Sequence, residues 1–218
     1  MRQTLALVAA LSCALPLAAQ SPQPSSAERG RWQQRAKQVT VYRDTFGVPH
    51  VHGTTDADVM FGMAYARSED RFQETEAAYI QSLGRQAELS GEDGVGWDVF
   101  FRAFEFERLG KEEFAAATPA LRALADAWAD GTNYFLFKHP AVRPKLPIRY
   151  QGWMLFTMYR SFAVSPEAAD VDLRALAKIV LPAARPEGEG SNMWAVSAAK
   201  SASGYPMLFV NPHTPLLP

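Results

Sequence analysis

The chain has 218 residues, a formal net charge of −1, 48% hydrophobic residues and 21% charged residues. This composition excludes a disordered tail, a collagen-like chain and a strongly basic nucleic-acid binder. The length allows one large domain or two small ones, with enough apolar residues for a sizeable core.

The first twenty residues have the pattern of a signal peptide. Arg2 precedes an apolar run from Leu5 to Leu17, and two small residues follow it. A buried core helix or an anchor is the alternative, but the run is shorter than the roughly 20 apolar residues that span a bilayer. Removal of residues 1–20 also removes Cys13, the only cysteine. We therefore expect an exported protein, periplasmic or secreted, whose mature form has no disulfide and no thiolate site.

The next segments in chain order alternate between leader, strand and helix signals. Residues 21–38 are rich in Pro, Ser, Gln and Arg and are predicted to be a mobile leader. Extended segments are expected at 39–42 and 50–53. A long helix is expected from an N-cap at Asp56 through Leu89, with a stop at Gly91. Further helices are predicted at 97–109, after the Thr118–Pro119 cap, at 153–162 and at 171–181.

The character of the sequence changes after residue 181. Residues 39–181 are expected to form a mostly helical region, and residues 182–190 an exposed linker. Two strands are predicted at 192–197 and 207–211, joined by a hairpin-like turn. A two-stranded hairpin is not stable alone, so it must add to the strands near residues 39–53 or to a sheet outside this chain.

The junction between the linker and the first of these strands holds the only Gly-Ser pair of the chain, Gly190–Ser191. Gly-Ser is a common loop dipeptide and is weak evidence by itself, so its interpretation depends on the sequence around it. The sequence SNMWAV at 191–196, then SASG at 201–204 and NPH at 211–213, resembles the start of the catalytic subunit in the penicillin acylase family, whose members are N-terminal nucleophile hydrolases. A second block resembles the signature of the family's α-subunit: FGVPHV at 46–51, FGMAYA at 61–66, EDR at 69–71 and GRQAEL at 84–89.

The resemblance implies an α+β fold with a four-layer αββα core, incomplete in this chain, and a largely helical α-subunit region. It also implies a precursor that cuts itself. The Ser191 hydroxyl attacks the Gly190 carbonyl, the peptide bond opens, and residues 191–218 begin the catalytic β-subunit. The partners are then the α- and β-subunits of one heterodimer and a small-molecule acyl-amide substrate, with no nucleic acid and no membrane.

The chemistry of the new N-terminus accounts for the role that the family gives this serine. A serine hydroxyl is a weak nucleophile and needs a neighbouring base. A free α-amine has an ordinary pKa of about 7.7–8.0, so a useful share is neutral near pH 7–8. Before the cut the same nitrogen is an amide and cannot act as a base. Scission therefore switches the enzyme on.

Other site residues follow from the resemblance or from local pattern. His213 is expected to orient Ser191 or to tune its amine, and its alternative is a turn cap after Pro212. Met158 and Phe162 stand at helical spacing where the family lines its acyl pocket, although such pairs are more often core. The family's oxyanion donors lie beyond the chain end, which predicts a fragment of a longer product. No cofactor is implied; some members bind a structural calcium, mostly outside this segment.

Several remaining polar residues are predicted to be structural. His50 and His52 alternate on one strand face and could ligate a metal, but no third ligand is near them in the sequence. Glu69, Asp70 and Arg71 could supply catalytic carboxylates, but a salt bridge on the helix surface or in the interior is the expected role. Trp194 is expected to pack in the core. Solvated charges are expected at Asp126, Asp130, Glu187 and Glu189.

Three functions are compatible with the sequence. The first is an exported, self-cleaving amidohydrolase that uses an acyl-serine intermediate, with β-lactam side-chain amides and N-acyl-homoserine lactones as candidate substrates. The second is an inactive fragment or a non-enzymatic binding remnant that lacks the oxyanion hole. The third is a periplasmic metal binder that uses His50 and His52. The first accounts for both sequence blocks.

Overall fold

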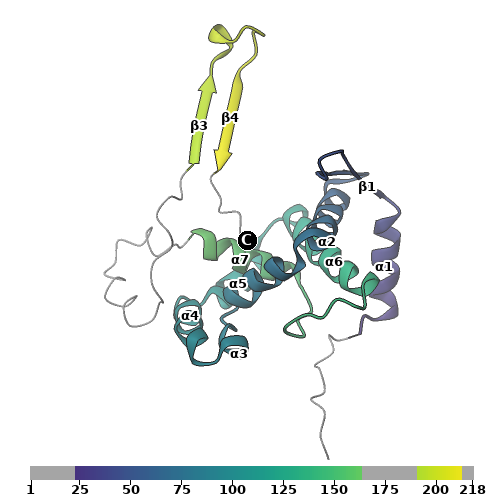
Figure 1. Cartoon of the computed structure of the whole chain (residues 1–218), viewed down its shortest axis with the longest axis vertical. Helices are drawn as coiled ribbons and strands as arrows, with labels where there is room; N and C mark the ends of the chain where they lie inside the picture. Colours follow the sequence, from purple (N-terminus) through teal and green to yellow (C-terminus); the bar gives the residue numbers. More distant parts are fainter. Residues whose placement is uncertain (1–22, 164–190, 213–218) are drawn as a thin grey trace, which may run out of the picture. The chain divides into compact units, whose positions relative to one another are not determined.

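The computed structural model describes residues 23–163 and 191–212, without the side chains of residues 162, 163, 191, 211 and 212. The chain divides into two units, Met1–Leu181 and Pro182–Pro218, and each is described by itself. The described part of the first unit holds seven α-helices and one hairpin, and that of the second holds another hairpin (Figure 1).

The N-terminal helix α1, Ser26–Ala36, corrects the prediction of a mobile leader over residues 21–38. Its first turn has a complete capping box, in which the Ser25 side chain accepts from the Glu28 N–H and the Glu28 carboxylate accepts from the Ser25 N–H. Trp32 on this helix is wholly buried. The segment was predicted to be mobile because its composition is polar. One buried tryptophan and one N-terminal cap are nevertheless enough to form this short helix and hold it in place.

Strands β1, Val39–Arg43, and β2, Pro49–Gly53, confirm the extended segments expected near residues 39–53. They pair antiparallel, with Val39 opposite Gly53 and Tyr42 opposite His50. The hairpin packs closely on the next helix at Gly62, where an added Cβ would lie 2.6 Å from the side chains of both Val39 and Val51. Only a glycine allows this approach.

Helix α2, Asp56–Ser82, is the long helix expected from the sequence, but its ends differ from the prediction. The N-cap is Thr55, not Asp56, and it forms a capping box with Asp58. The helix ends at Ser82, not near Leu89, because Gly84 turns the chain with a φ of +61°. The short helix α3, Ala87–Ser90, follows this turn.

The single helix predicted over residues 97–109 is two helices. These are α4, Glu92–Ala103, and α5, Phe106–Ala116. Between them Glu105 has a φ of 53°, in the left-handed region that ends a helix. Phe100, Phe101 and Phe106 form a small aromatic cluster around this break. Burial of these rings offsets the helical hydrogen bonds that the break removes.

Helix α6, Pro119–Lys138, begins at the predicted Thr118 cap with proline in its first turn, and α7, Gly152–Ala163, confirms the helix expected there. Helices α2 and α6 lie side by side, and the main core fills the space that they share with α7 and the segment before it (Figure 1). The buried members of this core are Phe72, Tyr79, Ile80, Leu83, Ala129, Phe135, Leu146, Ile148, Tyr150 and Met154.

The second unit contains the predicted hairpin. Strand β3, Ser191–Val196, pairs antiparallel with β4, Met207–Pro212, and the 3₁₀ turn η1, Ala198–Lys200, lies in the connection. Each of the two hairpins in the described residues forms a two-stranded sheet. The helix predicted at 171–181 and the linker at 182–190 lie outside the described residues.

Candidate functional site

The residue expected to carry the chemistry, Ser191, is the first residue of β3. The register places it opposite Pro212, the last residue of β4, and places Asn192 opposite Asn211. The hairpin therefore brings the sequence just before His213 back to the level of Ser191. Gly190 and His213 themselves lie outside the described residues, so the junction is placed here by the backbone of Ser191 and Pro212.

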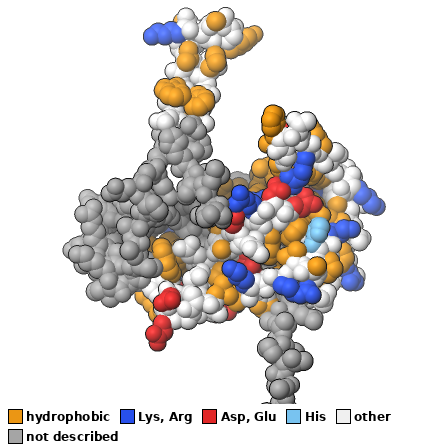
Figure 2. Space-filling model, in the orientation of Figure 1, with side chains coloured by type: hydrophobic (Ala, Val, Ile, Leu, Met, Phe, Trp, Pro, Cys, Tyr) orange, Lys and Arg blue, Asp and Glu red, His pale blue; other side chains and the backbone are white. Residues whose placement is uncertain are grey.

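Both faces of this hairpin are apolar. Trp194 stands opposite Phe209 and the two rings are 4.8 Å apart between centroids, while Met193 stands opposite Val210 on the other face. Figure 2 shows hydrophobic side chains along the length of the hairpin. Trp194 is 61% exposed, so the expectation that it packs in a core is wrong for the described part of the chain. Strands that are apolar on both faces are typical of a sheet covered on both sides.

The two residues expected to line an acyl pocket lie on α7. Met158 is half-buried and packs against the main core, and Phe162 is placed by its backbone alone. Two close contacts fix α7 against its neighbours. A Cβ at Gly110 of α5 would collide with the backbone nitrogen of Thr157 at 2.8 Å, and a Cβ at Gly152 would lie 2.8 Å from the ring of Phe114. The position of α7 is therefore set by helix packing.

The histidines at 50 and 52 share a face of β2, as expected. Both rings stack on Tyr42, with centroids 4.6 Å and 5.8 Å from it. His50 Nε2 lies 3.1 Å from the Asp44 carboxylate, and this contact and two backbone N–H donors hold the pKa of Asp44 below its usual value. Among the described residues no group of three or more His, Cys, Asp or Glu side chains is arranged to hold a metal ion.

The acidic pair after the FGMAYA block forms the predicted salt bridge, with a different partner. Glu69 and Asp70 both contact the guanidinium of Arg43 on β1, at 3.3 Å and 2.8 Å. Arg71 itself pairs with Glu74 and sits at a kink in α2, with non-helical φ and ψ. The cluster ties the hairpin to the helix, and both carboxylates are paired with a guanidinium, which fits a structural role.

Asp130 is a buried acceptor, which corrects the prediction of a solvated charge. Its carboxylate accepts two hydrogen bonds from Arg31, both of 2.9 Å, and a third from the indole N–H of Trp32 at 2.7 Å. Asp126, one turn earlier on α6, is exposed as expected. Glu187 and Glu189 lie outside the described residues. Local sequence could not predict the burial of Asp130, because its partners are about 100 residues away in the chain.

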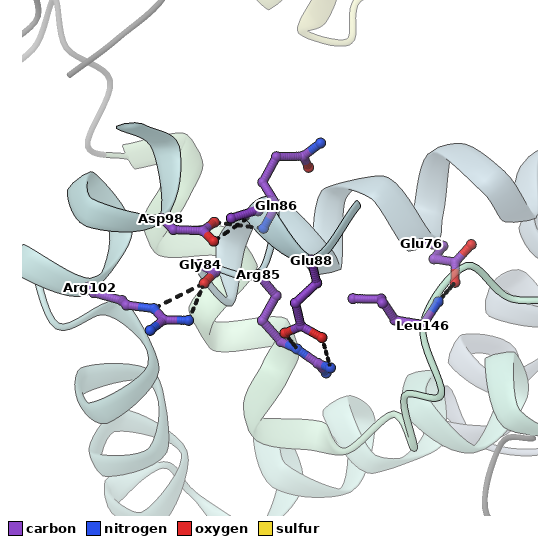
Figure 3. Close-up of polar contacts among 9 residues, drawn as sticks. Glu76, Gly84, Arg85, Gln86, Glu88, Asp98, Arg102 and Leu146 are labelled. Carbon is purple, nitrogen blue, oxygen red and sulfur yellow. Dashed lines mark hydrogen bonds and ion pairs between the residues drawn. The ribbon is translucent and has the colours of Figure 1, made fainter. Parts of the chain in front are cut away.

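The sequence analysis also missed Glu76, a wholly buried acid on α2. One of its oxygens accepts from the backbone N–H of Leu146 at 3.2 Å, and the other accepts no hydrogen bond from the described residues (Figure 3). Burial raises the pKa of Glu76. The residue fixes the segment before α7 to α2, close to the buried phenols of Tyr79 and Tyr150.

The turn that contains the GRQAEL block is held by two side chains of α4. Asp98 accepts from the backbone N–H groups of Gln86 and Ala87 at 2.6 Å and 2.9 Å, and Arg102 donates twice to the Gly84 carbonyl (Figure 3). An open pocket of about 620 Å³ lies beside this turn. Its wall includes Arg85 and Glu88, which form a bidentate ion pair. The charged side chains of the pocket wall pair with one another, so these residues fit a structural role.

In the described residues no helix is both long and apolar enough to cross a membrane. The segment predicted to be a signal peptide, residues 1–20, is outside the described residues. The geometry of the described part thus offers a helical unit without a catalytic constellation, and a hairpin that begins with the candidate nucleophile.

Comparisons with known proteins agree with both sequence blocks. A family model described as penicillin amidase matches residues 38–218. An acyl-homoserine lactone acylase of Pseudomonas putida is 30% identical over 112 residues, which cover 51% of this chain and 13% of that protein. A penicillin acylase 2 proenzyme of a Pseudomonas species is 25% identical and covers 80% of this chain and 30% of that protein. The chain thus spans less than a third of the length of these curated relatives.

Among solved structures, a thermostable penicillin G acylase from Alcaligenes faecalis matches with a TM-score of 0.55 and 24% identity, covering 64% of this chain and 79% of that chain. At this identity the likeness concerns the fold. It confirms the expected fold, which is that of the penicillin G acylase, and the described residues show mostly its helical part and few strands.

Proposed function

The chain belongs to the penicillin amidase family, and from this premise we propose that it is the precursor of an acylase that hydrolyses linear amides. The substrate is an amide between an acyl group and an amine. Relatives named penicillin acylase and acyl-homoserine lactone acylase support β-lactam side-chain amides and N-acyl-homoserine lactones as the substrate classes. The observation that carries the proposal is the family match, which runs through Gly190–Ser191 to residue 218.

The precursor is activated by one backbone cut. The Ser191 oxygen attacks the Gly190 carbonyl carbon and forms an ester, while the hydroxyl proton passes to the departing Ser191 nitrogen. Water then hydrolyses the ester, which releases a carboxylate at Gly190 and a free amine and hydroxyl on Ser191. A relative named a proenzyme supports such processing. The position of Ser191 as the first residue of β3 fits a strand that begins at the cut.

The same serine then performs the hydrolysis. Its amine, in the neutral form, takes the hydroxyl proton as the oxygen attacks the substrate carbonyl. The amine of the substrate leaves with that proton, and water releases the acid from the acyl-serine. Stabilisation of the oxyanion needs preorganised donors. The family resemblance places them further along the catalytic subunit. We propose that export by the N-terminal signal precedes this activation and that the cut subunits remain associated.

The test is mass spectrometry of the protein expressed from its complete reading frame. We expect two polypeptides, of which one begins Ser-Asn-Met-Trp, and amide hydrolysis that can be measured with penicillins and with N-acyl-homoserine lactones. Ser191→Ala should abolish both the cut and hydrolysis. Ser197→Ala is the matched control, because this serine lies in the same hairpin and its side chain makes no capping bond. An uncut protein with full activity would contradict the proposal.

A further inference from the structure

Buried polar atoms without a hydrogen-bond partner gather at one place in the helical unit. They are Oε2 of Glu76, the hydroxyl oxygens of Tyr79 and Tyr150 and the indole nitrogen of Trp128, and none of them bonds another described residue. Glu76, Tyr79 and Tyr150 are 0%, 1% and 3% exposed. Folded proteins leave few buried polar atoms unbonded, because such an atom gives up its bonds to water without replacement. Four of them in one place therefore call for a common partner.

Two helices and the segment before α7 bring these groups together. Glu76 and Tyr79 are three residues apart on α2 and share its buried face. The ring of Tyr150 lies 4.9 Å from that of Tyr79 between centroids. Burial raises the pKa of the Tyr79 phenol while the Trp128 N–H lowers it, so this donor of α6 lies beside the phenol oxygen. Figure 3 shows that the unbonded oxygen of Glu76 is turned away from Leu146.

Other hydrogen bonds hold the groups in position. The second oxygen of Glu76 accepts from the backbone N–H of Leu146 at 3.2 Å. The side chain of Asn133 on α6 donates to the carbonyl of Tyr150 at 2.8 Å and accepts from its N–H at 3.1 Å. These bonds fix the carboxylate and the backbone that carries the phenol, yet the polar ends stay unbonded. Polar groups that are fixed too far apart for a direct hydrogen bond are joined by a bridging molecule.

The chemistry of the four groups selects the bridging molecule. A cation would face the hydrogen of the Trp128 N–H, which carries partial positive charge, and an anion would face the Glu76 carboxylate. A water molecule can accept from the indole, exchange hydrogen bonds with the phenols and donate to the carboxylate. Buried waters make about two to four hydrogen bonds of this kind. We infer that these four side chains form a binding site for an internal water molecule.

This water joins three parts of the helical unit. It connects α2 with α6 and with the segment before α7, which leads directly to Gly152 at the start of α7. The site thereby contributes to the placement of that helix. The inference does not depend on the proposed function, because it concerns the stability of the helical unit and no step of amide hydrolysis.

Removal of one hydroxyl at a time tests the site by the sign of the change. A phenol that bonds a water stabilises the fold, whereas a buried hydroxyl without any partner opposes folding and its removal is neutral or favourable. For Tyr79→Phe and Tyr150→Phe we therefore expect the folding equilibrium constant of the 218-residue chain to fall about fivefold in urea titrations. Tyr159→Phe is the matched control, because its phenol is 68% exposed and its removal should leave the constant unchanged.

An unchanged or larger folding equilibrium constant in either Tyr79→Phe or Tyr150→Phe would overturn the inference. A high-resolution crystal structure of the unsubstituted chain is a second readout, which does not require the variants to fold. An ordered water within hydrogen-bond distance of Glu76 Oε2 and of at least one phenol oxygen supports the site. Direct bonds between these groups, an ion among them or the lack of an ordered water there overturns it. A protein that is never cut before Ser191 would refute the proposed function and leave this site unaffected.

Discussion

The packing of α1 against the rest of the helical unit depends on the side chain of Trp32. It is wholly buried among Phe61, Ala127 and their neighbours, and its N–H donates to Asp130, which also accepts two bonds from Arg31. The helix precedes the family match, which begins at residue 38. The buried hydrogen bond from Trp32 to the Asp130 carboxylate explains why α1, despite its polar sequence, forms an ordered helix.

We expect Trp32→Phe to lower the free energy of unfolding by about 2 kcal/mol or more, because it leaves a void and removes one donor from a buried carboxylate. Urea unfolding followed by circular dichroism measures this. Trp153→Phe is the matched control, since its indole N–H bonds the exposed side chain of Gln151 and should cost under about 1 kcal/mol. Equal losses in the two variants would show that the buried bond to Asp130 contributes nothing.

Glu76 gives the molecule a pH dependence of known sign. Burial raises its pKa in the folded state above the value of 4.5 that it has when exposed. The folded state therefore binds the proton more tightly than the unfolded state. The stability from this group is fully present below about pH 4.5 and is lost as the pH rises through the raised pKa.

We therefore expect Glu76→Gln to remove this loss, because the amide is neutral at every pH and its oxygen can still accept from the Leu146 N–H. The free energy of unfolding of the variant relative to the native chain should increase from pH 4 to pH 8, in a series of urea titrations. Glu74→Gln, at a half-buried position on the same helix whose carboxylate contacts Arg71, should show no such increase. Parallel curves for the native chain and Glu76→Gln would refute the argument.

At the scale of elements, helix crossings depend on glycines that permit backbone contact. At Gly131 of α6 an added Cβ would collide with the carbonyl oxygen of Phe61 on α2, and at Gly110 of α5 it would collide with the hydroxyl of Thr157 on α7. Such contacts leave no room for a methyl group, because the obstacles belong to the facing helix backbone or to a wholly buried side chain.

We expect Gly131→Ala and Gly110→Ala each to lower the free energy of unfolding by about 1–3 kcal/mol through overpacking. Gly30→Ala on α1 should have the opposite effect and add about 0.5–1 kcal/mol, because nothing lies within 4 Å of its added Cβ and alanine favours the helix. Thermal melts of the three variants provide the comparison. An unchanged or higher melting temperature for Gly131→Ala would show that the α2–α6 crossing tolerates a wider spacing.

At the scale of the whole molecule, the two units differ in how much they bury. The helical unit buries a main core and two smaller clusters, whereas the hairpin exposes large apolar residues on both faces. An isolated two-stranded hairpin is marginal in water. In hydrogen–deuterium exchange on the 218-residue chain, we expect the amides of β3 and β4 to exchange much faster than those of α2 and α6. Comparable protection in the two units would mean that the hairpin is stabilised by contacts of its own.

The sequence by itself determined the elements whose signals are local. The Thr118–Pro119 cap, the strands around the 201–206 turn, the helical spacing of α7 and the two family blocks are all set by residues near one another in the chain. Tertiary structure decided the rest. The break at Glu105, the docking of α1, the burial of Glu76 and Asp130, and the pairing of Ser191 with Pro212 all depend on partners from other elements. Local pattern reports propensity and period, but burial and strand register are fixed only when distant segments pack together.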